Sequence, residues 1–203
     1  MLHVRRLISV MAVDSRDFTV LTRQLDETIL SEAIGTWLRR AGEILTQYGS
    51  GVDKSIGDAV MAVWVHGPEG ANAADMRHIL QAVQTLATMT RHLHEQFPLP
   101  FPLRIGAGLN TGYAMVGNTG SANRPDYTAL GDTVNAALRL ESSTKQLGID
   151  LAMGETTYAS LQALGASETY FHRHTVLLKG YEAPITTHGG TFANLDQFLG
   201  QQI

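Results

Sequence analysis

The chain has 203 residues, of which 44% are hydrophobic, and a formal net charge of −4 at pH 7. This length is enough to bury a substantial core within one domain. Acidic and basic residues are interspersed along the chain, which argues against a nucleic-acid-binding surface. The sequence contains no cysteine, which excludes disulfides and thiolate chemistry and suits a reducing compartment.

No segment of the sequence predicts a membrane span. The longest apolar run, "AVMAVWV" (59–65), is far too short to cross a bilayer. No charged-then-apolar signal peptide precedes the first predicted strand. We therefore expect a single cytoplasmic domain over residues 1–203 that contacts neither membrane nor nucleic acid. It would stand alone or form part of a larger multidomain or membrane-attached protein.

Hydrophobic patterns predict the elements of the first half of the chain. The run "RLISVMAVD" (6–14) predicts a buried strand. Apolar residues recur at helical spacing over about 26–48, and Gly49 follows as a stop. The segment "GVDKSIGDAVMAVWV" (51–65) predicts two short strands joined at "IGD", with the glycine in the turn.

In the second half, helical spacing returns over 72–96, and the prolines at 98, 100 and 102 prevent its continuation. The segment "LRIGAGLNTGYAMVGN" (103–118) predicts a second hairpin, and 127–146 predicts a turn that runs into a helix. Shorter strands and a short helix at about 155–163 complete the chain. The order β-α-β-β-α-β with C-terminal additions predicts an α+β, ferredoxin-like fold, in which helices pack on one face of an antiparallel sheet.

This topology brings two carboxylates together, because its first and third strands are antiparallel neighbours. Asp14 ends the first strand, and Asp58 begins the third just after the Gly57 turn. Two adjacent carboxylates repel each other unless one is protonated or a cation is bound. A small number of carboxylate ligands suits Mg²⁺ or Mn²⁺, which take further ligands from water and substrate phosphates. The alternative is that each Asp only caps a turn.

Five motifs together resemble the catalytic domain of class III nucleotidyl cyclases. They are "AVDSRDFT" (12–19), "DKSIGDAVMAVW" (53–64), "GAGLNTGYAMVGNTGS" (106–121), "DYTALGDTVNAALRLES" (126–142) and "LLKG" (177–180). The match keeps motif order and approximate spacing from the first strand to the last. The resemblance implies a cyclase homology domain that converts a nucleoside triphosphate to the 3′,5′-cyclic monophosphate and pyrophosphate.

The resemblance also assigns the metal and base sites. Asp14 and Asp58 match the ligands of two Mg²⁺ or Mn²⁺ ions, and Lys54 and Thr128 match the pair that reads the purine. In this family two domains pair head to tail and share the active sites. Since no functional position is missing here, the resemblance implies a homodimer in which one chain supplies the two acids and its partner the remaining site residues.

The remaining matches concern the ribose and the phosphates. Asn135 matches the residue that orients the ribose, and Arg139 the residue that stabilises the transition state. They are four residues apart, so both lie on one face of the predicted helix. Lys179 matches the lysine that grips the terminal phosphates, and the turn with Phe18 and Thr19 matches the one whose backbone cradles the triphosphate.

The base-reading pair favours adenine over guanine. Lysine only donates hydrogen bonds, so Lys54 suits N1 of adenine, which is an acceptor. Thr128 can accept from the adenine amino group. Guanine would leave its N1–H facing a second donor, at a cost of roughly 1–3 kcal/mol. The threonine decides less, because its hydroxyl can also donate to a carbonyl. ATP is the expected substrate and cyclic AMP the product, with GTP as the alternative.

The sequence departs from the family at the turn after Asp14, where a hydrophobic residue and a glycine are usual. Here Ser15 and Asp17 stand at those positions. An acid at position 17 would either repel phosphate or cap a helix, and we expect the cap. The departure leaves open a catalytically silent domain that serves dimerisation or regulation.

A ferredoxin-like module that binds RNA would need exposed aromatic residues and a basic face, which the sequence does not show.

Overall fold

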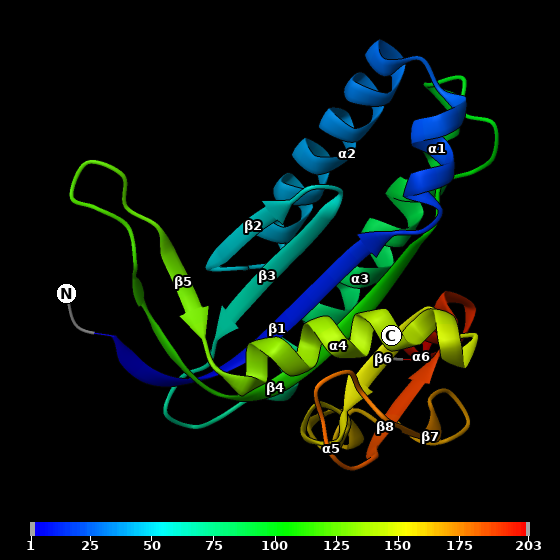
Figure 1. The fold of residues 1–203 in the computed structure, drawn as a ribbon. Helices are drawn as coiled ribbons and strands as arrows, with labels where there is room; N and C mark the ends of the chain where they lie inside the picture. The colour runs from blue at the N-terminus through cyan, green and yellow to red at the C-terminus, as the bar shows by residue number, and fades with distance from the viewer. Residues whose placement is uncertain (1–2, 202–203) are drawn as a thin grey trace.

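The structure of the protein is a computed structural model and describes residues 3–201. A twisted sheet runs through the molecule, with helices on both of its faces (Figure 1). The elements, in chain order, are β1 (Val4–Ser15), α1 (Phe18–Gln24), α2 (Glu27–Gln47), β2 (Val52–Ile56), β3 (Ala59–Val65), α3 (Ala73–His92), the 3₁₀ helix η1 (Leu93–Glu95), β4 (Ile105–Asn118), β5 (Tyr127–Leu130), α4 (Asp132–Leu147), β6 (Leu151–Gly154), α5 (Glu155–Gln162), β7 (His172–Val176), β8 (Ile185–Gly190) and α6 (Phe192–Gly200).

The sheet has the strand order β2-β3-β1-β4-β6-β8-β7, and β5 pairs with the far end of β4. β1 lies at the centre of the ferredoxin-like part, antiparallel to both β3 and β4. The pair β4–β6 is parallel. This arrangement confirms the α+β fold and the antiparallel pairing of the first and third core strands. Within residues 3–201, no helix has the length and hydrophobicity that crossing a membrane requires.

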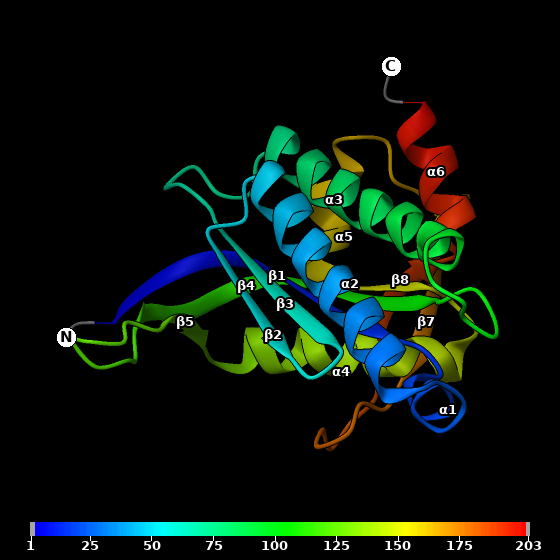
Figure 2. The same cartoon turned by 90° about the horizontal axis from the view of Figure 1, so that it is seen from above.

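The helices divide between the two faces of the sheet. Figure 2 shows α2 and α3 over one face and α4 against the other. The main core lies under α2 and α3, where Trp37 and Met76 are fully buried. A second cluster packs Val134 and Ala137 of α4 against β1, β3 and β4. The expectation that the helices share one face therefore holds for the two core helices and is wrong for α4.

The predicted hairpin over 103–118 is wrong, because these residues form one long strand, β4. Several glycines of this strand make room for neighbouring groups. A Cβ atom at Gly108 would lie 2.3 Å from the carbonyl oxygen of Ala137 and from the backbone nitrogen of Glu141, both in α4. At Gly112 it would lie 2.7 Å from Thr133 Oγ1. Glycine lets the helix approach the strand this closely.

The segment 127–146 also divides differently from the prediction. Residues 127–130 form β5, which pairs with β4, and α4 begins only after Gly131. The φ of Gly131 is +141°, a conformation that side chains rarely adopt. We call the paired segment 115–130 the β4–β5 hairpin; it projects from the body of the molecule (Figure 1).

A buried chain of polar side chains crosses the centre of the sheet. Nε2 of His66 lies 2.7 Å from Ser9 Oγ, which lies 2.8 Å from Thr111 Oγ1. His66 is 2% exposed, and its Nδ1 lies 3.6 Å from Oδ2 of Asp75. Burial lowers the pKa of His66, although the Asp75 carboxylate opposes the shift. Folding therefore disfavours the protonated form of this imidazole.

We predict that Gly108→Ala destabilises the protein by about 2 kcal/mol or more, because the new methyl group meets the backbone of α4. Gly35→Ala is the matched control: its Cβ would meet nothing within 4 Å, and it lies inside α2. That change should stabilise by about 0.5–1 kcal/mol through helix propensity. Chemical denaturation of both variants measures the difference; equal effects would contradict the packing argument.

We predict that His66 lowers the free energy of unfolding of the protein at acidic pH. A histidine whose pKa is lower in the folded than in the unfolded protein does not change stability at pH values above its unfolded pKa of about 6.5. As the pH drops below that value, the free energy of unfolding decreases. Between about pH 8 and about pH 5, the wild type should lose more free energy of unfolding than His66→Gln. Urea titrations of both proteins at the two pH values measure this, and parallel losses would rule out the histidine as the cause.

Candidate functional site

The structure brings Asp14 and Asp58 together, as the predicted topology requires. Asp14 lies opposite Ala59 in the antiparallel register of β1 and β3, and Asp58 precedes Ala59 in the turn between β2 and β3. Gly57, with a φ of +61°, forms that turn. Two acids distant in sequence therefore share one end of the sheet.

In the protein without a bound cation, the two carboxylates repel each other. Burial, reinforced by the neighbouring Asp58 carboxylate, raises the pKa of Asp14 to about 6. Oδ1 of Asp14 is buried, and no residue in the described part of the chain gives it a hydrogen bond. Ser15 Oγ donates a hydrogen bond to Oδ2 of Asp58 and so helps to orient that carboxylate. A hard divalent cation would satisfy the unpartnered oxygen and remove the repulsion, so these residues fit Mg²⁺ or Mn²⁺.

A third acid, Glu141, lies close to this pair and was missed by the sequence reasoning. Burial, with the charge of Asp14 as a second cause, raises the pKa of Glu141 to about 7, while Arg16 opposes the rise. The helical period could have revealed it, because Glu141 continues the sheet-facing positions of Val134 and Ala137. Within residues 3–201, no group of three or more His, Cys, Asp or Glu side chains converges as a metal cluster.

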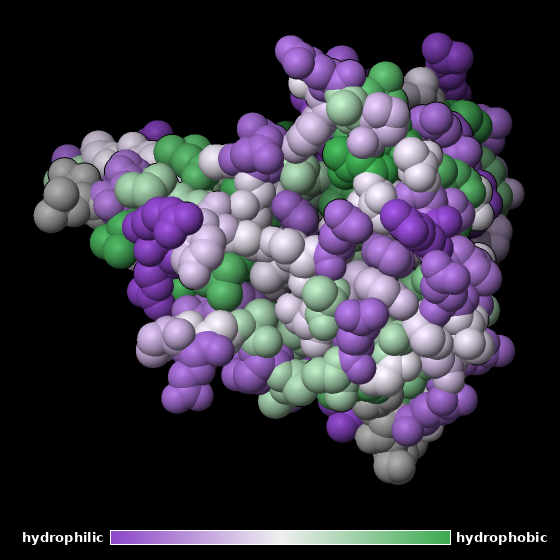
Figure 3. All heavy atoms as spheres, turned by 90° about the horizontal axis from the view of Figure 1, so that it is seen from below, coloured by the Kyte–Doolittle hydropathy of each residue, from purple (hydrophilic) through white to green (hydrophobic). Residues whose placement is uncertain are grey.

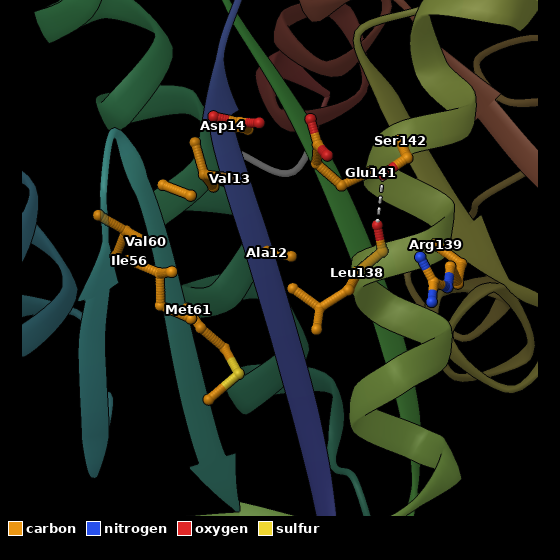
Figure 4. Close-up of a pocket in the computed structure, with 11 residues that line it drawn as sticks. Ala12, Val13, Asp14, Ile56, Val60, Met61, Leu138, Arg139, Glu141 and Ser142 are labelled. Carbon is orange, nitrogen blue, oxygen red and sulfur yellow. Dashed lines mark hydrogen bonds between the residues drawn. The ribbon is translucent and has the colours of Figure 1, made fainter. Parts of the chain in front are cut away.

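A cleft opens between β1, β3 and α4 beside Asp14 (Figure 4). Its apolar lining includes Ala12 and Met61 from the strands and Leu138 from the helix. Figure 4 shows Leu138 and Glu141 directed from α4 toward β1, whereas the Arg139 guanidinium extends from the other side of the helix. Arg139 lines the same cleft as Asp14, but within one chain its guanidinium is directed away from β1.

The two predicted base-reading residues lie at the β4–β5 hairpin end of the site. Nζ of Lys54 in β2 lies 2.6 Å from Oδ1 of Asp126, just before β5. Thr128, two residues further on, is 7% exposed. The hydrogen bond from Lys54, reinforced by its charge, lowers the pKa of Asp126. The structure thus pairs Lys54 with an acid that the sequence reasoning did not identify and that lies two residues before Thr128.

The predicted ribose and transition-state residues lie on α4, whose first turn is anchored to β4. Thr133 Oγ1 donates to the carbonyl of Tyr113 at 2.7 Å, and Asn110 Nδ2 donates to the carbonyl of Thr133 at 3.1 Å. Asn135 is exposed and Arg139 half-buried, one helical turn apart. The helix therefore presents both side chains from a rigidly held element.

The predicted phosphate-binding residues lie on two separate segments of the chain. Lys179 is exposed on the segment that joins β7 to β8, while Leu178 beside it is 2% exposed and anchors that segment. Phe18 and Thr19 begin α1, the helix that follows the turn after Asp14. The first N–H groups of a helix have no intrahelical acceptor, so this turn can offer donors.

The expectation that the Asp17 side chain caps a helix is wrong. Asp17 occupies the N-cap position of α1, but its side chain makes no cap hydrogen bond. The carboxylate instead pairs with Arg104 Nη2 at 3.1 Å. Its φ is +61°, the only positive value among the non-glycine residues that the structure describes. The backbone therefore keeps the conformation that glycine, usual here in the resembled family, adopts most easily.

Comparisons with known sequences identify relatives along nearly the whole chain. A sequence model of the adenylate and guanylate cyclase catalytic domain matches residues 4–189. The terminal-differentiation-specific adenylate cyclase of Dictyostelium discoideum is 32% identical over 164 residues, 79% of this chain and 7% of that protein. An adenylate cyclase of Anabaena cylindrica is 25% identical over 183 residues, 90% of this chain and 36% of that protein. The chain thus spans only a minor part of these relatives.

Solved structures agree with the sequence matches. The adenylyl cyclase CyaB from P. aeruginosa superposes with a TM-score of 0.77 at 26% identity, covering 93% of this chain and 95% of that one. The guanylyl cyclase Cya2 gives a TM-score of 0.76, also at 26% identity, and 93% of each chain is covered. Since the family model covers far more than half of its residues, this chain belongs to the adenylate and guanylate cyclase catalytic domain family.

Proposed function

We propose that the protein is an adenylyl cyclase that converts ATP to 3′,5′-cyclic AMP and pyrophosphate. The observation that carries the proposal is the half-buried pair Asp14 and Asp58, in which a buried oxygen of Asp14 has no partner and the two carboxylates repel each other, so that a cation is called for. Family membership and the adenylate cyclases among its relatives supply the reaction class. In this reaction the ribose 3′-oxygen bonds to the α-phosphorus, and the bond from that phosphorus to the bridging oxygen breaks.

Asp14 and Asp58 would hold two divalent cations, whose chemistry here is to acidify the ribose 3′-hydroxyl and to offset triphosphate charge. The polypeptide contributes position and hydrogen bonds. Arg139 would present its planar donor fork to the oxygens of the five-coordinate phosphorus. Asn135, one turn earlier on α4, would hold the ribose, and Lys179 the terminal phosphates. Because catalysis of this kind is mostly positioning, the anchoring of α4 to β4 is part of the machinery.

The direction of Arg139 supports a homodimer with shared sites. In one chain Arg139 lines the cleft beside Asp14, but its guanidinium extends from the side of α4 that faces away from β1 (Figure 4). This direction supports a site in which a second chain supplies the arginine for that acid pair. Exposed apolar side chains surround the β4–β5 hairpin, as the green patches on the projecting arm in Figure 3 show. Tyr113, Tyr127 and Leu130 are each more than half exposed. Apolar surface of this kind is typical of an interface.

The base-reading groups favour ATP. Lys54 is a pure donor, which matches N1 of adenine and opposes the N1–H of guanine. The Thr128 hydroxyl can accept from the adenine amino group. A guanylyl cyclase remains the second candidate, because the same hydroxyl can donate to the guanine carbonyl and Cya2, a guanylyl cyclase, shares the fold.

We predict that the purified protein with Mn²⁺ or Mg²⁺ forms cyclic AMP from ATP and little cyclic GMP from GTP. Specific activity should rise with protein concentration, because each site needs two chains. Chromatographic detection of both products at several protein concentrations tests this. Cyclic GMP as the main product would show that the substrate is GTP rather than ATP. No product from folded, dimeric protein would favour a silent regulatory domain.

We predict that Asp14→Asn and Arg139→Ala are each nearly inactive, with losses on the order of 10³-fold, and that mixing them restores activity. In a random mixture, half of the dimers combine the two variants and contain one intact site of two. The mixture should therefore regain about a quarter of wild-type activity. Each variant mixed with itself is the control. A mixture that stays inactive, although subunits exchange, would place Asp14 and Arg139 in the same chain's site.

A further inference from the structure

We propose that Asp126 is a specificity-determining residue of the base site: it fixes the ammonium of Lys54 and disfavours guanine. The inference rests on the proposed function, because it concerns the site that would read the purine. Nζ of Lys54 lies 2.6 Å from Oδ1 of Asp126, the distance of a charge-assisted hydrogen bond. Without such a partner, the lysine side chain would be free to sample many rotamers.

The position of Asp126 is itself fixed where the loop of the β4–β5 hairpin meets its paired strands. Its backbone N–H donates to Asn118 Oδ1 at 2.7 Å, and its carbonyl accepts from the N–H of Thr119 at 2.8 Å. Asn118 Oδ1 also accepts from the N–H of Gly120 at 2.8 Å. Thr119 Oγ1 lies 3.4 Å from Oδ2 of Asp126, the oxygen next to the one that holds the lysine. Asp126 is thus a prearranged partner for Lys54.

Asp126 lies immediately before β5, two residues before Thr128, so the Lys54–Asp126 ion pair is close to Thr128 along the chain. The lysine donates, while the carboxylate adds negative potential beside the threonine. An amino group at position 6 of the purine, as in adenine, is attracted by that potential. The carbonyl oxygen of guanine at the same position is repelled.

The Lys54–Asp126 pair is accessible to a ligand. The side chain of Lys54 is 25% exposed and that of Asp126 is 54% exposed. The ammonium carries three N–H groups, so the bond to Asp126 leaves two for a base. A fully exposed ion pair would contribute little, but a bound base would exclude water from this one and strengthen it. The pair is therefore suited to selecting a ligand rather than to stabilising the fold.

The test compares Asp126→Asn with wild type in cyclase assays with ATP and GTP. The variant should lose about tenfold in the ratio of kcat/KM for ATP to that for GTP, mainly through KM, with Asp126→Glu restoring most of it. Glu43→Gln is the matched control, since it removes the same charge from an exposed ion pair with Arg39 on α2, across the sheet. In a Lys54→Met background, Asp126→Asn should change the ratio much less.

Calorimetric titration with α,β-methylene ATP and α,β-methylene GTP provides a second measurement, independent of turnover. Asp126→Asn should weaken binding of the ATP analogue more than that of the GTP analogue. An unchanged ratio in an active enzyme would overturn the inference and leave the proposed function standing. Tighter binding of the ATP analogue would also overturn it, because Asp126 would then compete with the base for Lys54. A wild type without cyclase activity would instead refute the proposed function.

Discussion

The close packing of α4 on β4 is the constraint on which the rest of the site depends. At Gly108 the backbones approach so closely that a single methyl group would lie 2.3 Å from the helix. Hydrogen bonds from Thr133 and Asn110 fix the first turn of α4 on the same strand. These contacts therefore fix the position of the helix, and with it the positions of Asn135 and Arg139. A reaction that relies on positioning requires this rigidity, because small displacements of catalytic groups cost large factors in rate.

Parts of this arrangement could be predicted from the sequence because they follow from topology. The strand order makes Asp14 and Asp58 neighbours whatever their side chains do. A hairpin was predicted over 103–118 in place of the single strand β4, because a glycine that admits a helix and a glycine that forms a turn look alike in one sequence. The partners of Asp17 and Lys54 were beyond prediction for another reason. Each ion pair joins elements that are distant in the chain, and only the folded geometry selects it.

The acidic side chains of the site are in excess, and the basic side chains Arg16 and Lys54 already have other partners. Arg16, the basic residue nearest the acids in sequence, donates to the carbonyl of Ile149 at 2.6 Å and lies 3.9 Å from Asp150. Lys54 is paired at the other end of the site. The raised pKa values of Asp14 and Glu141 show that this balance is unfavourable for the protein alone. Under the proposed function, bound divalent cations would offset the repulsion between the acids. The free-energy cost of placing the acids there without cations therefore favours cation binding.

The same geometry explains why a dimer would be needed rather than merely tolerated. Leu138 and Glu141 face the strands that carry the acids. Arg139 lines the same cleft, but its guanidinium extends from the other side of α4. A helix cannot present one side chain in two directions, and turning it would bring Cβ-bearing positions against Gly108. A two-fold axis resolves the conflict, because each chain then offers its acids to one shared site and its α4 to the other.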